Sequence, residues 1–135
     1  MFFEYALTVP ANTLQAAPSE LEMPLSPGTV VLVSVQFPRG CVGLVHVQVL
    51  GAEHQVWPTN LDGDIAGENA NISWPEDLDL TDSPYALTLR AWNLDDTFPH
   101  TVTFRCAVMP LSQKEEARAG VGILQRLRDT LIGGS

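Results

Sequence analysis

The feature that most constrains this chain is an alternation of apolar and polar side chains, broken by proline or glycine about every ten residues. Successive side chains of a β-strand point to opposite faces, so this alternation is typical of strands with one buried face. Short strands at such regular spacing are typical of a β-sandwich or barrel. The sequence therefore predicts an all-β protein, an antiparallel, jelly-roll-like β-sandwich of about eight strands.

Two pairs of segments show the alternation most clearly, and each is expected to form a hairpin: 31–37 with 44–50, and 85–92 with 101–108. The apolar faces of the two strands match when Val35 lies opposite Val45, and when Leu89 lies opposite Phe104. Weaker strands are expected at 3–9, 21–25, 53–57, 72–74 and 78–80.

The pattern changes near residue 112. Ser112 and Glu115 form a capping box, which is typical of a helix start. Apolar residues then recur at helical spacing, at Ala117, Val121, Leu124, Leu127 and Leu131. We therefore expect a β-sandwich domain at 1–111 and an amphipathic helix or arm at 112–135, packed either on its own domain or on a neighbour.

Charge excludes two classes of partner. The chain has 16 acids and 7 bases, a net charge of −9. Nucleic-acid binding and adhesion to anionic membranes both rest on lysine and arginine, so neither is expected. Residues 1–112 hold 13 acids and 3 bases, whereas residues 113–135 hold 3 acids and 4 bases. The acidic character therefore belongs to the β-domain.

The N-terminus and the cysteines bear on location. The opening Phe2-Phe3-Glu4 lacks the basic region and the long apolar run of a secretory signal, and no apolar stretch is long enough to span a membrane. We expect a soluble protein made in a cytoplasm. Cys41 and Cys106 could form one disulfide, but reduced, packed thiols are favoured there.

Catalytic motifs are absent from the sequence. There is no glycine-rich phosphate loop, no serine elbow and no HExxH zinc motif, and the three histidines lie far apart. Cys106 is expected to point into the core, where a thiol is unreactive. The sequence predicts neither an enzyme nor a cofactor.

Two kinds of ligand site are possible on residue type alone. Asp62, Asp64 and Glu68 supply oxygen ligands of the kind that calcium prefers, although their spacing is not that of an EF-hand. Trp57, Trp74 and Trp92, with His100 near a strand end, could form a stacking platform for a sugar. Trp92 is expected to face outward.

Assembly is the remaining hypothesis. The outer face of the valine hairpin carries leucines, the chain opens on two phenylalanines, and the tail is amphipathic. The residues expected to contact a partner or another copy are Phe2, Phe3, Leu32, Leu44, Leu50, Val121, Leu124, Leu127 and Leu131.

The sequence opens with Phe2-Phe3-Glu4-Tyr5 and predicts about eight short strands, an acidic loop region and a short terminal arm. In these features it resembles the small β-sandwich virion proteins of tailed phages, of the head-decoration or cement type. The resemblance implies a homo-oligomeric structural protein of the virion, with a trimer favoured, that binds the capsid without catalysis. The alternative is a carbohydrate- or ligand-binding β-sandwich, with or without stabilising calcium.

Overall fold

The computed structural model describes residues 1–111, which fold into nine strands. Their bounds are β1 Phe2–Val9, β2 Ser19–Pro24, β3 Gly28–Phe37, β4 Val45–Gly51, β5 His54–Trp57, β6 Ile65–Ala66, β7 Ala70–Leu80, β8 Ala86–Asn93 and β9 His100–Pro110. The expected helix or arm at 112–135 lies outside the described residues.

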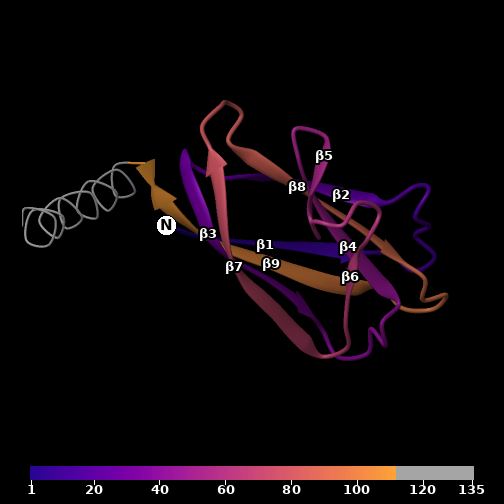
Figure 1. Ribbon diagram of the computed structural model, residues 1–135. Helices are drawn as coiled ribbons and strands as arrows, with labels where there is room; N and C mark the ends of the chain where they lie inside the picture. Colours follow the sequence, from indigo (N-terminus) through magenta and orange to yellow (C-terminus); the bar gives the residue numbers. More distant parts are fainter. Residues whose placement is uncertain (112–135) are drawn as a thin grey trace, which may run out of the picture.

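The strands form two antiparallel sheets stacked as two layers (Figure 1). One sheet has the order β1-β9-β3-β7, and the other has the order β2-β8-β4-β5, with the two-residue β6 beside β4. We name them sheet A and sheet B. With β6 set aside, this is the strand order of an eight-stranded jelly roll. The predicted fold class, an all-β antiparallel sandwich, is confirmed.

The two expected hairpins are wrong. Val35 lies opposite Ile72 and Phe104 in sheet A, whereas Val45 lies opposite Asn93 in sheet B. The loop after β3 and the loop after β8 each cross from one sheet to the other. The alternation of apolar and polar residues shows which side chains of a strand are buried. It is the same whether two successive strands pair within one sheet or face each other across the sandwich, so it does not identify the pairing.

A register shift in β3 changes one inward residue. Val30 is fully buried and Val31 only half-buried, because the pairing with β7 and β9 shifts between Val30 and Leu32. Such a bulge inserts an extra residue into one strand. The inward series of β3 therefore runs through Val30, Val33 and Val35 instead of starting at Val31.

The core fills the space between the sheets. Its largest fully buried side chains are Phe37, Phe104, Met23, Leu87 and Leu89, surrounded by a set of valines. Full burial of one such side chain stabilises the fold by about 1.5–3 kcal/mol. Cys41 and Cys106 are free thiols in this core, and burial raises the pKa of Cys106 to about 11.

Four loops meet at one end of the sandwich. They are residues 10–18 after β1, 38–44 after β3, 67–69 before β7 and 94–99 after β8. The strand ends that carry them are paired, Val9 with His100, Phe37 with Ala70, and Val45 with Asn93. We call this end, formed by the four loops, the loop end.

Candidate functional site: the loop end of the sandwich

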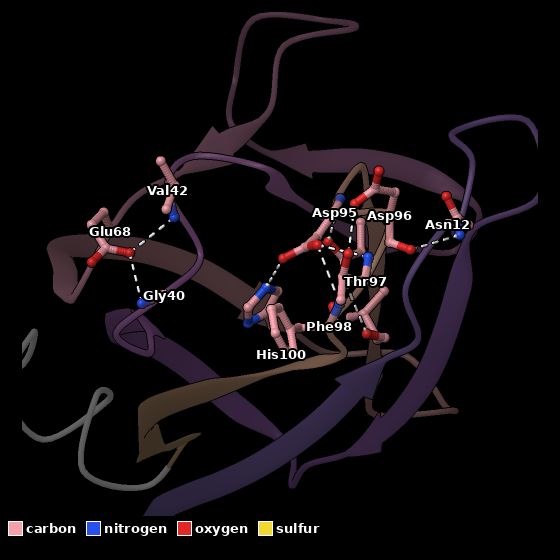
Figure 2. Close-up of polar contacts among 11 residues, drawn as sticks. Asn12, Gly40, Val42, Glu68, Asp95, Asp96, Thr97, Phe98 and His100 are labelled. Carbon is pink, nitrogen blue, oxygen red and sulfur yellow. Dashed lines mark hydrogen bonds and ion pairs between the residues drawn. The ribbon is translucent and has the colours of Figure 1, made fainter.

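Asp95 holds the loop between β8 and β9 in one conformation (Figure 2). Its Oδ1 accepts hydrogen bonds from the main-chain N–H groups of Thr97 at 2.9 Å and Phe98 at 3.1 Å, and its Oδ2 lies 2.8 Å from Nε2 of His100. These bonds, that of Thr97 above all, lower the pKa of Asp95 below its usual value. The carboxylate is therefore occupied in fixing the loop.

Two asparagines tie this loop to its neighbours. The buried Asn93 donates from Nδ2 to the carbonyl oxygens of Val9 and Phe98, and its Oδ1 accepts from Asp95 N. Asn12 donates its main-chain N–H to Asp95 O and its Nδ2 to Asp96 O. Loops 10–18 and 94–99 are thus joined into one hydrogen-bonded unit.

Glu68 fixes the loop between β3 and β4. Its Oε1 accepts hydrogen bonds of 2.9 Å from the main-chain N–H groups of both Gly40 and Val42 (Figure 2). Val42 has φ of 50°, in the left-handed region that β-branched residues rarely adopt, at a cost of roughly 1–2 kcal/mol. Its side chain is also 71% exposed. Neither its backbone conformation nor its exposure stabilises the domain.

Further large apolar side chains are exposed in the same loops. They are Leu14, Leu94 and Phe98, which is 63% exposed. With Val42 they make four exposed apolar side chains carried by loops that side-chain hydrogen bonds hold in place. We call these four residues the loop-end apolar set. Backbone strain and exposed apolar groups together are features of binding surfaces, where contact with a partner offsets the cost of both.

A second exposed apolar feature lies on the outer face of sheet A. Phe2 is paired with Ala107, Ala107 with Leu32, and Leu32 with Pro75, so four outward residues form one row across the sheet. Phe2 is 65% exposed and Leu32 46% exposed. We call these residues the sheet A row. Two residues predicted to make partner contacts, Phe2 and Leu32, are thereby brought together.

The next row across sheet A is polar. Arg105 lies between Glu4 and Ser34, and its Nε donates to Glu4 Oε1 at 2.8 Å. Its guanidinium also donates to Gln36 Oε1 at 2.6 Å. The sheet A row is therefore an apolar stripe bordered on this side by charged and hydrogen-bonded side chains.

Other residues predicted to make contacts lie elsewhere. Phe3 packs against the core from the inner face of β1, Leu44 is half-buried in the loop end, and Leu50 is buried in sheet B. The leucines expected on one hairpin face are therefore divided among two sheets and a loop, because β3 and β4 belong to different sheets. Val121, Leu124, Leu127 and Leu131 lie beyond the described residues.

Trp92 faces outward from sheet B, as expected, but only 3% of it is exposed. His46 stacks on it, with ring centroids 5.5 Å apart and planes 9° from parallel. The loop before β6 lies over this face, because Gln48 donates to Gly63 O and His46 pairs with Asp64 at 2.7 Å. Trp92 is therefore not an open platform for stacking.

The other ligand residues are also separated. Trp57 is 3% exposed and lies against Trp74 and Phe104, while His100 is held by Asp95 at the loop end. Of the residues predicted for the platform, Trp57 and Trp74 are in contact, whereas Trp92 and His100 lie apart from them.

Two of the three residues suggested for calcium have side-chain partners within the protein. Asp64 pairs with His46, and Glu68 accepts from two main-chain N–H groups. Asp62 lies exposed in the loop before β6. Within residues 1–111 no group of three or more histidine, cysteine, aspartate or glutamate side chains is arranged to hold a metal ion.

The loop-end apolar set was not predicted from the sequence. Single apolar residues in loops carry no periodic signal, and the left-handed φ of Val42 has no signature in sequence. No family model matches the sequence. No curated protein matches it either. Residues 1–111 contain no helix that is long and apolar enough to cross a membrane.

Proposed function

We propose that this protein is a structural assembly protein that docks on a larger protein particle through the loop-end apolar set and acts without catalysis. The observation that carries the proposal is Val42, a β-branched side chain held in the left-handed region by Glu68 while largely exposed. A partner that buries Val42 and Phe98 gains apolar contact without having to order the loops, because their conformations are already fixed.

The sheet A row supports contact between copies of this protein. Exposed apolar stripes with polar borders are typical of subunit interfaces. A trimer, in which each copy presents Phe2 and Leu32 to its neighbour, is the arrangement we favour. The partner we propose is the capsid of a tailed phage, with this protein as a decoration or cement protein of the virion.

Light scattering and sedimentation test both contacts. Light scattering on the purified protein is expected to give a trimer, which Phe2→Ser with Leu32→Ser converts to monomer with an unchanged circular dichroism spectrum. The control is Leu61→Ser, an apolar side chain that is even more exposed than Phe2 and Leu32 but lies outside both surfaces.

Co-sedimentation with tailed-phage heads lacking their decoration protein tests docking. The unaltered protein is expected to pellet with the heads, whereas Val42→Asn and Phe98→Ser are expected to bind at least ten-fold more weakly. A protein that stays monomeric at every concentration and never pellets with heads would overturn the assembly proposal.

A polar cavity on the outer face of sheet B favours sugar binding as a second candidate. It has a volume of about 270 Å³ and is lined by amide and charged side chains, among them Gln15, Gln48, Glu53, Gln55 and Arg90. Amides and carboxylates are the groups that hydrogen-bond sugar hydroxyls. On a glycan array the protein is expected to bind at least one glycan, and this binding is expected to be lost in Gln15→Ala and Arg90→Ala. An array on which the protein binds no glycan excludes this candidate.

A further inference from the structure

A different cavity lies on the side of the sandwich where β5 and β6 of sheet B face β7 of sheet A. Its volume is about 270 Å³, and its walls include Trp57, Pro58, Ile65, Ile72, Trp74 and Glu76. Pockets for drug-sized ligands span about 300–1,000 Å³. The cavity therefore suits one small organic group.

Two tryptophans and one carboxylate define its chemistry. The indole planes of Trp57 and Trp74 are inclined at 76°, with centroids 5.9 Å apart. Their Nε1–H groups both donate to Oε1 of Glu76, at 2.8 and 3.0 Å. Glu76 is thereby anchored beside two aromatic walls. Its second oxygen, Oε2, accepts a longer bond of 3.3 Å from Asp77 N.

The strand that carries this group is irregular at the same point. The β3–β7 register shifts between the pairs Val30–Leu78 and Leu32–Pro75, which gives β7 one extra residue near Glu76. Bulges of this kind redirect side chains and are frequent beside binding sites. The inner face of β7 is only half-buried here, so both Trp74 and Glu76 remain accessible.

These walls select a weakly hydrated cation. A carboxylate attracts positive charge, and indole rings attract cations by their electron-rich faces. A metal ion needs several oxygen ligands, and a plain ammonium needs hydrogen-bond acceptors to replace its water, whereas these walls are mostly apolar. We propose that the Trp57–Trp74–Glu76 cavity binds a methylated ammonium group.

The probe pair choline and 3,3-dimethyl-1-butanol separates charge from shape, because the second is the neutral isostere of the first. Both are titrated into the ¹⁵N-labelled protein, and the indole N–H resonances are followed. Choline is expected to shift the resonances of Trp57 and Trp74 saturably and to leave that of Trp92 in place. The neutral isostere is expected to bind at least ten-fold more weakly.

Substitutions locate the site. Glu76→Gln keeps an oxygen for the indole donors but removes the charge, so choline binding is expected to fall at least ten-fold. Trp74→Phe removes one indole wall and is expected to weaken binding as well. Asp62→Asn, which removes a carboxylate from an exposed loop instead, is expected to change nothing. Equal binding of the two probes, unchanged binding in Glu76→Gln, or no indole shift at all would overturn the proposal.

Two peptides then identify the source of the group. A peptide with trimethyllysine that binds more tightly than choline, while its unmethylated form does not bind, assigns the cavity to a modified protein side chain. Binding of choline that exceeds binding of both peptides assigns it to a small molecule or a choline headgroup. Either result supports the methylammonium site, and the wild-type protein alone suffices for this comparison.

Discussion

The carboxylate of Glu68 accepts a 2.9 Å hydrogen bond from the main-chain N–H of Val42, a residue 26 positions earlier that sits in the left-handed region with φ of 50°. The same oxygen accepts from Gly40, so one side chain from the β6–β7 loop fixes the loop between β3 and β4. The contact joins the two sheets at the loop end, because β3 and β7 belong to sheet A and β4 to sheet B.

Replacement of Glu68 by alanine is expected to lower the free energy of unfolding by about 1 kcal/mol, since two N–H groups lose a charged acceptor and water replaces it only in part. Glu68→Gln keeps an oxygen and is expected to lose less. Urea unfolding measures the change, and amide exchange at Val42 is expected to quicken in Glu68→Ala. Glu22→Ala, an exposed carboxylate on β2, is the control; an equal loss there would contradict a specific role for Glu68.

Val42→Gly is expected to raise the free energy of unfolding by about 0.5–1 kcal/mol. Relief of the left-handed backbone outweighs the greater freedom that glycine gains in the unfolded chain. The same variant is expected to dock less well, because the exposed side chain is gone. Leu61→Gly, an exposed loop residue whose φ is not positive, is expected to lose stability. A stability loss in Val42→Gly would show that the residue is not strained.

Low pH is expected to weaken the hydrogen bonds by which Asp95 holds the loop between β8 and β9. The pKa of Asp95 is lowered in the folded protein by the N–H of Thr97, by His100 and by the N–H of Phe98. The ionised carboxylate therefore stabilises the fold above the usual aspartate pKa of about 3.9, and this contribution is lost as the pH falls through the lowered folded pKa. In urea unfolding, the stability gap between the unaltered protein and Asp95→Asn is expected to be larger at pH 7 than at pH 2. A gap that is independent of pH would contradict the assignment, and Asp62→Asn serves as the control.

Both cysteines are expected to resist thiol reagents in the folded protein. Burial raises the pKa of Cys106 to about 11 and, with the charges of Glu68 and Asp95, raises that of Cys41. Only thiolate reacts, and neither side chain is exposed. Labelling by a disulfide reagent at pH 8 is expected to be slow in buffer and to reach two thiols per chain in urea. Fast labelling of the native protein would show that one of the two thiols is accessible.

The sequence predicted which face of the strands points inward, but it did not predict which strands pair with one another. The sequence identified Val33, Val35 and Phe37 as one buried face, and each is fully buried. It could not tell whether Val35 pairs with Val45 or faces the other sheet, because both arrangements bury the same side chains. Strand pairing depends on which loops cross from one sheet to the other. Loops 38–44 and 94–99, of seven and six residues, are long enough either to close a hairpin within one sheet or to cross between sheets.

The candidate site shows the same division. Leu32 was predicted to make contacts from the outer face of a valine-rich strand, and Phe2 as one of the two phenylalanines that open the chain; the structure places them in one row with Ala107 between them. Trp92 was correctly oriented outward, yet the loop before β6 and the ring of His46 cover that face. Cover by a loop depends on contacts between residues distant in sequence, which local periodicity does not record.

The sequence by itself determined that residues 1–111 form an acidic, all-β domain, because alternation and charge are properties of each segment taken alone. Only the tertiary structure decided that four loops converge at one end, that Glu68 holds Val42 in a strained and exposed position, and that Trp57, Trp74 and Glu76 surround a cavity. These relationships join residues 2 to 84 positions apart. The physical reason is that the preference of a side chain for burial follows from its own polarity, whereas pairing and loop closure are set by the free energy of the whole fold.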